Sequence, residues 1–142
     1  MTTTMISTSR PMVQAAIIAF AAAAALAPPS ASADTPASQL AGYTAQAGAP
    51  AQPARGQQLF TATHGKAWSC ASCHTAQPVV DGKHASTGKP IGPMAPAFNP
   101  ERFTDAAKTE KWFRRNCNDV MSRECTAAEK ADVLAWLVSL KR

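Results

Sequence analysis

The stretch Cys70-Ala71-Ser72-Cys73-His74 determines how the rest of this sequence is interpreted. Its two cysteines are about one helical turn apart, so a helix places both thiols on one side, with an imidazole directly after them. Thiols at this spacing can bond to two vinyl groups on one edge of a haem, and the histidine can ligate the iron. Cys-x-x-Cys-His is the attachment motif of c-type haem, and histidine is a common proximal ligand of haem iron. The motif therefore predicts one covalently bound haem c, attached through Cys70 and Cys73 and ligated by His74.

A Cys-x-x-Cys pair also occurs in zinc sites and in redox-active thiol proteins. A zinc site needs two further ligands, and the remaining cysteines, Cys117 and Cys125, do not form a second pair of this spacing. His64 or His84 would then have to contribute. A thioredoxin-like pair is expected in a βαβ setting, which this sequence does not show. Haem attachment is therefore favoured over a non-haem thiol protein.

The N-terminal segment has the features of an export signal. Arg10 precedes an apolar run over residues 12–27, which is followed by prolines and the small residues Ala31-Ser32-Ala33. This order is typical of a secretory signal peptide, and the run is shorter than the roughly 20 apolar residues that a membrane-spanning helix needs. We therefore predict a signal peptide over residues 1–33 and a single haem-binding domain over residues 34–142. The mature protein is expected to be periplasmic, without stable membrane insertion.

The charge of the chain is mildly basic. The net charge is +5, and the loss of Arg10, the one charged residue among residues 1–33, would lower it to +4. No nucleic-acid motif or basic stripe with interleaved aromatic residues accompanies this charge, so nucleic acid is not an expected partner. The basic residues that could form a docking patch for an acidic redox partner, or simply a solvated helix face, are Lys108, Lys111, Arg114, Arg115 and Arg123.

Helix signals precede the motif. Thr35-Pro36 supplies a cap residue and a proline at the first helical position, which predicts a helix that ends near Gln46. A second helix is expected to begin near Ala54 and to carry Gly56 and Phe60. In the class I cytochrome c plan, which these flanks resemble, the helix before the motif crosses the last helix closely at a glycine.

Two further helices are predicted in the C-terminal half. Thr104 is expected to cap a helix that ends near Arg115, followed by a turn over residues 116–125. Thr126-x-x-Glu129 is a capping box for the last helix, whose broad apolar face comprises Val133, Leu134, Trp136, Leu137 and Leu140. Residues 75–100 are rich in glycine and proline and show no convincing strand, so we expect an irregular but ordered wrap. The predicted fold is all-α, with helices packed around one covalent haem.

The iron ligand opposite His74 decides the function. A methionine there is typical of an electron carrier, whereas a weak ligand leaves a site for small gases. The two other histidines lie too close to the motif to reach the opposite face of the haem easily. The class I plan takes the ligand from the turn between the third and last helices, and spacing alone then favours Met121. The candidates are His64, His84, Met94, Asn116, Asn118 and Met121.

Cys117 and Cys125 are predicted to form a disulfide. Export would place them in an oxidising compartment, and they are close in sequence. Closing so short a loop stabilises the fold by about 2.5 kcal/mol in the chain-entropy treatment. The bond would also pin the segment that contains Asn116.

Several runs of the sequence resemble sphaeroides haem protein and its relatives. The likeness extends over essentially the whole mature chain, and the Asn116-Cys117 pair is its specific element. The matching runs are Arg102-Phe103-Thr104-Asp105, Glu110-Lys111-Trp112-Phe113-Arg114-Arg115-Asn116-Cys117-Asn118, Cys125-Thr126, Glu129-Lys130-Ala131-Asp132, Gly88-Lys89-Pro90-Ile91, Ala95-Pro96, Leu40-Ala41-Gly42-Tyr43 and Arg55-Gly56.

This resemblance implies a class I-like monohaem cytochrome c with Asn116 as the sixth ligand and a Cys117–Cys125 disulfide. It also implies that the asparagine leaves on reduction, that the ferrous iron binds oxygen, nitric oxide or carbon monoxide, and that a dihaem cytochrome c is the redox partner. An amide oxygen is a hard neutral donor, which suits ferric better than ferrous iron.

Two other functions stay open at this point. A thioether at Met94 or Met121 could compete for ferrous iron, and the protein would then be a conventional electron-transfer cytochrome with histidine and methionine ligands. An enzyme that oxidises nitric oxide or reduces peroxide is less favoured, because no distal acid–base pair is visible near Asn116. An electron-transfer or ligand-binding haem protein is favoured over a turnover enzyme.

Overall fold

The computed structural model describes Met1 and residues 34–142. The predicted signal peptide, residues 1–33, therefore lies outside the described residues except for Met1, and its cleavage site stays a prediction. The described residues 34–142 belong to one compact unit. None of the helices in that unit is long and apolar enough to cross a bilayer.

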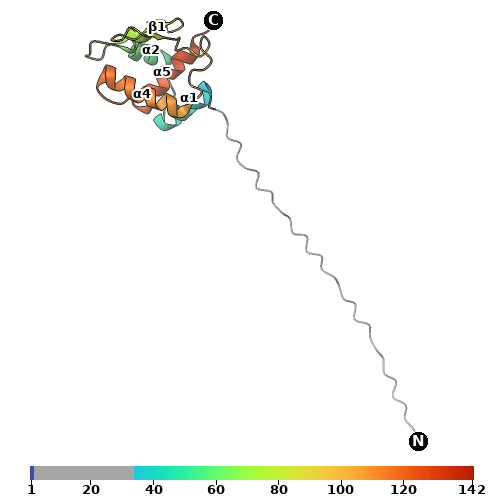
Figure 1. The fold of residues 1–142 in the computed structure, drawn as a ribbon. Helices are drawn as coiled ribbons and strands as arrows, with labels where there is room; N and C mark the ends of the chain where they lie inside the picture. The colour runs from blue at the N-terminus through green and yellow to red at the C-terminus, as the bar shows by residue number, and fades with distance from the viewer. Residues whose placement is uncertain (2–33) are drawn as a thin grey trace. The chain divides into compact units, whose positions relative to one another are not determined.

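The described part of the chain consists mainly of helices, with one short antiparallel hairpin (Figure 1). In Figure 1, α2 and the hairpin lie on one side and α1 and α4 on the other, with α5 between them. This composition confirms the all-α prediction, and the hairpin is an addition that the sequence did not predict. The elements in chain order are α1 Pro36–Ala47, α2 Pro53–Thr61, α3 Cys70–His74, β1 Gly82–Lys83, β2 Pro90–Ile91, α4 Ala106–Met121 and α5 Ala127–Ser139.

Local cap residues determine where α1 and α5 begin. The Thr35 side chain accepts a hydrogen bond from the backbone N–H of Ser38 at 3.0 Å. At α5, Glu129 N–H donates to the Thr126 hydroxyl at 3.2 Å, and Thr126 N–H donates to the Glu129 carboxylate at 2.8 Å. These bonds satisfy N–H groups that have no partner within the helix. The two predicted helix starts are confirmed.

The start of α4 differs from the prediction by one residue. Asp105, not Thr104, is the N-cap, because its carboxylate accepts from the backbone N–H of Lys108 at 2.8 Å. The Thr104 hydroxyl instead donates to the carbonyl of Glu101 at 2.9 Å. A carboxylate at this position also interacts favourably with the helix dipole.

The predicted end of α4 near Arg115 is wrong. The helix continues to Met121 and ends where Ser122 adopts the left-handed conformation, with φ 57°. It continues because side chains at helical spacing keep facing the core beyond Arg115; the buried residues of α4 are Thr109, Cys117 and Val120. The first part of the segment expected as a turn is therefore helical, and Asn116 lies on a helix.

Helices α2 and α5 cross closely at Gly56. A Cβ atom on Gly56 would collide with the backbone carbonyl of Asp132, so this approach requires glycine. The Asp132 carboxylate is only 1% exposed and accepts hydrogen bonds from Arg55 and from Gln52 N–H, which begins α2. A negative charge is favourable at a helix N-terminus. The predicted crossing at Gly56 is confirmed.

Helix α5 forms the centre of the hydrophobic core. Residues 130–137 are all buried. Around them, one cluster joins Phe60, Val133, Trp136 and Leu137, and a second joins Tyr43, Ala131 and Leu134. Truncation of a fully buried leucine to alanine typically costs roughly 2–5 kcal/mol. This core holds α1 and α2 against α5, and α2 in turn supports the motif helix α3.

Residues 75–100 are ordered by backbone hydrogen bonds, although they are mostly irregular. The carbonyl of Pro78 accepts from Met94 N–H at 2.9 Å. The Arg102 guanidinium donates to the carbonyls of Pro93 and Gly92, at 2.8 and 2.7 Å. Hydrogen bonds therefore connect different parts of the segment after the motif to each other, and connect this segment to Arg102.

Candidate haem site

Helix α3 consists of the attachment motif alone. Ser69 precedes it, and the Ser72 hydroxyl accepts from Ser69 N–H at 3.0 Å. The helix ends after His74 because Thr75 has a positive φ of 66°. A single helical turn thus carries both thiols and the imidazole, as the motif spacing predicts.

The two thiols of the motif have different surroundings. Neither forms a disulfide. Cys70 packs against the cluster of Phe60, Trp136 and their neighbours, and burial raises the pKa of its thiol to about 11. Cys73 faces the hairpin, where Ala85 N–H donates to its sulfur at 3.3 Å.

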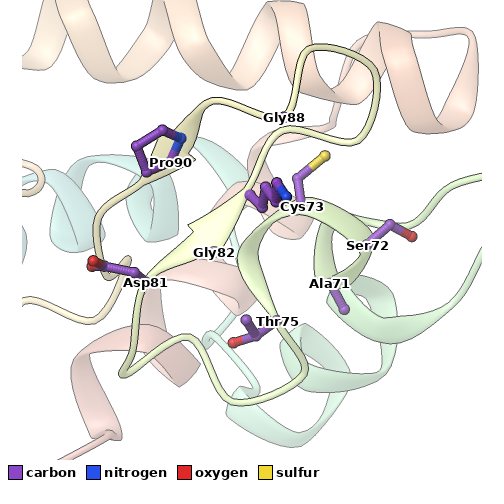
Figure 2. A pocket seen from close by; sticks show the side chains of 9 residues that line it. Ala71, Ser72, Cys73, Thr75, Asp81, Gly82, Gly88 and Pro90 are labelled. Carbon is purple, nitrogen blue, oxygen red and sulfur yellow. The ribbon is translucent and has the colours of Figure 1, made fainter.

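A pocket of about 440 Å³ adjoins Cys73 on the outer side of α3 (Figure 2). Figure 2 shows the hairpin passing over the motif, with the Cys73 sulfur directed toward the turn that contains Gly88. A Cβ atom on Gly82 would collide with the carbonyl of Cys73, so the hairpin lies directly against the motif backbone. The pocket does not reach His74, so it is not the site of the iron ligand.

His74 has the properties of a metal ligand. Its Nδ1 atom is buried and has no hydrogen-bond partner among the residues that the structure describes. Burial, together with the charges of Arg102 and His84, lowers the pKa of His74 to about 4, so the imidazole is neutral at pH 7. Its ring centre lies 6.2 Å from that of Phe60. A neutral, incompletely bonded imidazole beside two unpaired thiols fits a covalent haem, which Cys70, Cys73 and His74 could hold.

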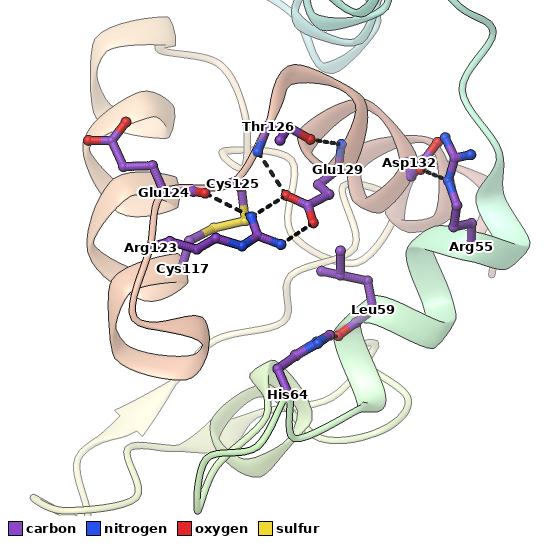
Figure 3. Close-up of polar contacts among 10 residues, drawn as sticks. All are labelled: Arg55, Leu59, His64, Cys117, Arg123, Glu124, Cys125, Thr126, Glu129 and Asp132. Atoms are coloured by element: carbon purple, nitrogen blue, oxygen red, sulfur yellow. Dashed lines mark hydrogen bonds and ion pairs between the residues drawn. A yellow bond between two sulfur atoms is a disulfide. The ribbon is translucent and has the colours of Figure 1, made fainter.

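The zinc alternative finds no support in the geometry. Within residues 34–142, no three histidine, cysteine or carboxylate side chains gather as metal ligands. His64 is exposed, and its Nε2 hydrogen-bonds the carbonyl of Leu59 at 2.7 Å (Figure 3). The Nδ1 of His84 accepts from Thr87 N–H at 3.2 Å. The ring nitrogens of both histidines thus form hydrogen bonds with nearby backbone groups.

The candidates for the sixth ligand lie in different places. Asn116 is partly buried on α4, and no hydrogen bond of its amide is found within the described part of the chain. Asn118 is exposed and donates to the carbonyl of Arg114 at 2.8 Å, which directs it away from the core. Met121 is the last residue of α4 and is partly buried. Met94 packs against the cluster that contains Phe60. Cys70 and Ala71 of the motif helix pack against the same cluster.

The predicted disulfide between Cys117 and Cys125 is present, with 5.6 Å between the Cα atoms. It connects α4 to the residue before the Thr126 cap of α5. Figure 3 shows the Arg123 guanidinium beside this disulfide, paired with both carboxylate oxygens of Glu129 at 2.6 and 2.8 Å. The residue next to Asn116 is therefore anchored to α5.

The five basic residues predicted as a docking patch, four on α4 and Arg123 in the loop after it, do not all remain unpaired. Arg123 points toward α5, and Arg114 forms an exposed ion pair with Glu124 at 3.5 Å. Arg115 lies over the ring of Trp112, with its guanidinium carbon 5.6 Å from the ring centre. Of the five basic residues of the predicted patch, those with no acidic partner within the described residues are Lys108, Lys111 and Arg115, and all three are exposed.

Sequence reasoning missed one polar cluster near the site. Lys130 is 8% exposed and pairs with Glu110 of α4, and Tyr43 of α1 donates to the same carboxylate at 3.0 Å. One signal was available, because Lys130 begins the run of residues 130–137 that are otherwise almost all apolar. Its partners could not be identified, since Tyr43 lies 67 residues from Glu110 in sequence.

The fold and the motif helix define a c-type cytochrome, in which an all-α domain carries one covalently bound haem c. A family described as a domain of unknown function (DUF1924) matches residues 46–137. The cytochrome c-type protein SHP of Cereibacter sphaeroides is 52% identical over 121 residues, which are 82% of this chain and 93% of SHP. This chain belongs to the DUF1924 family and to the sphaeroides haem protein family.

Solved structures agree with this assignment. The structure of oxidized SHP, described as an oxygen-binding cytochrome c, is 50% identical with a TM-score of 0.72 and covers 77% of this chain and 100% of that protein. Oxidized cytochrome c'' from Methylophilus methylotrophus is 34% identical with a TM-score of 0.66, over 75% of this chain and 95% of that protein. The predicted class I cytochrome c-like fold and the single haem c are confirmed.

Proposed function

We propose that this chain is a periplasmic haem protein that binds small diatomic ligands and is linked to electron transfer. In this proposal Cys70 and Cys73 attach the haem, His74 is the proximal ligand, and Asn116 occupies the sixth position in the oxidised protein and leaves it on reduction. The observation that carries the proposal is the partly buried, unbonded amide of Asn116, which is anchored beside the Cys117–Cys125 disulfide in a chain related to an oxygen-binding cytochrome.

The haem supplies an iron that changes its charge by one electron and can accept a small gas. The chain's own residues supply the rest. His74 presents a neutral nitrogen. Asn116 presents a neutral amide, whose oxygen suits a ferric better than a ferrous centre. The apolar cluster around Phe60 excludes water from the histidine side.

The anchoring of α4 supports a release of Asn116 by movement of its side chain. Cys117 is 4% exposed and bonded to Cys125, so the backbone beside Asn116 has little freedom. The amide itself has no competing hydrogen bond within the described residues that would hold it. Detachment of a haem ligand is also the subject of the solution structure of the related cytochrome c''.

The redox partner in this proposal is an acidic protein, and a dihaem cytochrome c is the candidate. The exposed and unpaired cations Lys108, Lys111 and Arg115 lie on α4, the helix that carries Asn116. A cluster of one charge sign steers an oppositely charged partner toward this helix.

A conventional electron carrier is the second candidate, with Met121 as the competing ligand. Met121 is partly buried and lies on the same helix as Asn116. Met94 is less suited, because it packs against the cluster that also supports the motif helix.

Substitution of Asn116 tests the proposal. We expect Asn116→Ala to keep its covalent haem but to change the oxidised spectrum from low-spin to high-spin, because the sixth ligand is lost. Asn118→Ala is the matched control, since Asn118 is exposed and bonded to its own helix. The reduced wild-type protein should bind carbon monoxide promptly. An unchanged oxidised spectrum in Asn116→Ala, with reduced protein indifferent to carbon monoxide, would favour the electron carrier.

A further inference from the structure

An ion pair between the buried Lys130 and the half-buried Glu110 joins α5 to α4, the helix that carries the candidate ligand Asn116. Lys130 of α5 is 8% exposed, although lysine is almost never buried without a partner. Its ammonium pairs with the Glu110 carboxylate of α4 and lies 5.6 Å from the centre of the Tyr43 ring. The Tyr43 hydroxyl, from α1, donates to the other oxygen of Glu110 at 3.0 Å. These residues form the Tyr43–Glu110–Lys130 cluster.

This cluster is one of the contacts that hold α4 to the other helices. The backbones of α1 and α2 pack closely on α5, whereas α4 reaches the other helices mainly through side chains. Phe113 contacts the edge of the Tyr43 ring, with 5.7 Å between ring centres and an interplanar angle of 85°. The disulfide at Cys117 adds a covalent tie. Asn116 thus lies between a polar anchor at Glu110 and a covalent anchor at Cys117.

The contacts of the cluster favour the charged form of Glu110. Burial alone would raise the pKa of Glu110, but hydrogen bonds from Lys130 and Tyr43 outweigh it and hold the pKa below its usual value. Removal of the Glu110 carboxylate would leave the ammonium group of the buried Lys130 without its acidic partner, which is unfavourable. Glu110 precedes Asn116 by six residues, which is about 9 Å along the helix axis. Glu110 contacts Lys130 of α5 and Tyr43 of α1. These two contacts therefore restrict both the rotation of α4 about its axis and the distance between α4 and α5.

We infer that the Tyr43–Glu110–Lys130 cluster positions Asn116 for the sixth position of the haem. This inference rests on the proposed function and deepens it. The three residues are positioning residues, because they act through α4 and have no role at the iron. When the cluster is broken, α4 can rotate, and Asn116 spends less time as a ligand of oxidised iron. The reduced protein, which has already released Asn116, should be unaffected.

Glu110→Gln tests this inference, with imidazole as the probe of the oxidised protein. A ligand that binds the open form gains affinity in proportion to the fraction of open sites. We expect imidazole to bind oxidised Glu110→Gln about tenfold more tightly than wild type, which corresponds to about 1.4 kcal/mol. The carbon monoxide affinity of the reduced protein should stay within about twofold of wild type.

A second variant covers the case in which Glu110→Gln does not fold. Replacement of both members of an ion pair that is largely removed from water by apolar residues is often neutral for stability. Lys130 is buried and Glu110 is half-buried, so Glu110→Leu/Lys130→Met should fold. It loses the polar anchor and should show the same gain in imidazole affinity. Arg55→Gln is the matched control, because it breaks the pair with buried Asp132 that ties α2 to α5 and does not contact α4. It should lower the melting temperature and leave imidazole binding unchanged.

Three results would overturn the inference. The first is wild-type imidazole affinity in both cluster variants. The second is an equal gain in Arg55→Gln, which would indicate general loosening of the fold. The third is a parallel change in carbon monoxide affinity, which would indicate a change in the whole pocket. If Asn116→Ala itself leaves imidazole binding unchanged, both the proposed function and this inference fail. If Asn116→Ala changes imidazole binding and the cluster variants do not, only this inference fails.

Discussion

Gly56 and Gly82 permit close backbone approach without adopting unusual dihedral angles. At Gly56 the neighbour is the carbonyl of Asp132 on α5, and at Gly82 it is the carbonyl of Cys73 in the motif helix. Neither glycine has a positive φ, so the requirement is steric. A single methyl group at either position would force two segments apart, one at the helix crossing and the other at the haem attachment site.

Gly56→Ala should therefore destabilise the protein, although alanine normally favours helix. We expect the free energy of unfolding to fall by about 3 kcal/mol, at the upper end of the usual cost of overpacking, as measured by urea denaturation of the haem-loaded protein. Gly42→Ala is the control, because a Cβ there meets no atom within 4 Å. This control should gain up to about 1 kcal/mol from helix propensity. Equal stabilities of the two variants would contradict the role of the crossing.

At the scale of elements, the start of α5 combines a capping box with an ion pair. Glu129 accepts from Thr126 N–H and from both terminal nitrogens of Arg123, which belongs to the loop after α4. The hydrogen bond from Arg123 contributes most to lowering the pKa of Glu129 to about 2. The same carboxylate thus holds the first turn of α5 and the loop that leads to the disulfide.

This pKa predicts how the contribution of Glu129 depends on pH. A carboxyl group whose folded pKa is depressed stabilises the fold above its unfolded pKa, near 4.5, and loses that effect as the pH falls through about 2. We expect Glu129→Gln to unfold about 1 kcal/mol more easily than wild type at pH 7, with the difference shrinking below pH 4.5 and vanishing near pH 2. Chemical denaturation across this range measures it. A difference that does not depend on pH would refute the assignment.

At the scale of the whole molecule, the disulfide has two consequences. Cys117 and Cys125 connect the helix that carries Asn116 to the helix at the centre of the core. Both sulfurs belong to buried residues, with 4% and 8% exposure. The bond therefore constrains the unfolded chain and also restricts the movement of α4 in the folded protein.

Cys117→Ser/Cys125→Ser should separate these consequences. We expect the free energy of unfolding to fall by about 2.5 kcal/mol from the lost loop constraint, as measured by urea denaturation. In the folded variant, imidazole should bind the oxidised protein more tightly, because α4 is less restrained. Wild type with its disulfide reduced is the matched comparison, and it should behave as the double variant does. Unchanged imidazole binding in both would limit the disulfide to a role in stability.

The features that could be predicted from the sequence are those whose interacting residues are close together in the chain. The attachment motif lies within a single turn, Thr126 and Glu129 of the predicted capping box are three residues apart, and the two cysteines of the disulfide are eight residues apart. In each case the interacting groups are brought together by one turn or one short loop, so spacing is sufficient evidence. The glycine at the helix crossing was also predictable, but only through the resemblance to the class I plan.

The other features depend on contacts between segments that are far apart in the chain. The extension of α4 through Asn116 depends on side chains that face the core beyond Arg115, and no cap signal marks it. The burial of Lys130 and the anchoring of Gln52 by Asp132 depend on partners that are 20 and 80 residues distant in sequence. Local spacing carries no information about such contacts, because they form only when the packing of α1, α2 and α4 on α5 brings the partners together.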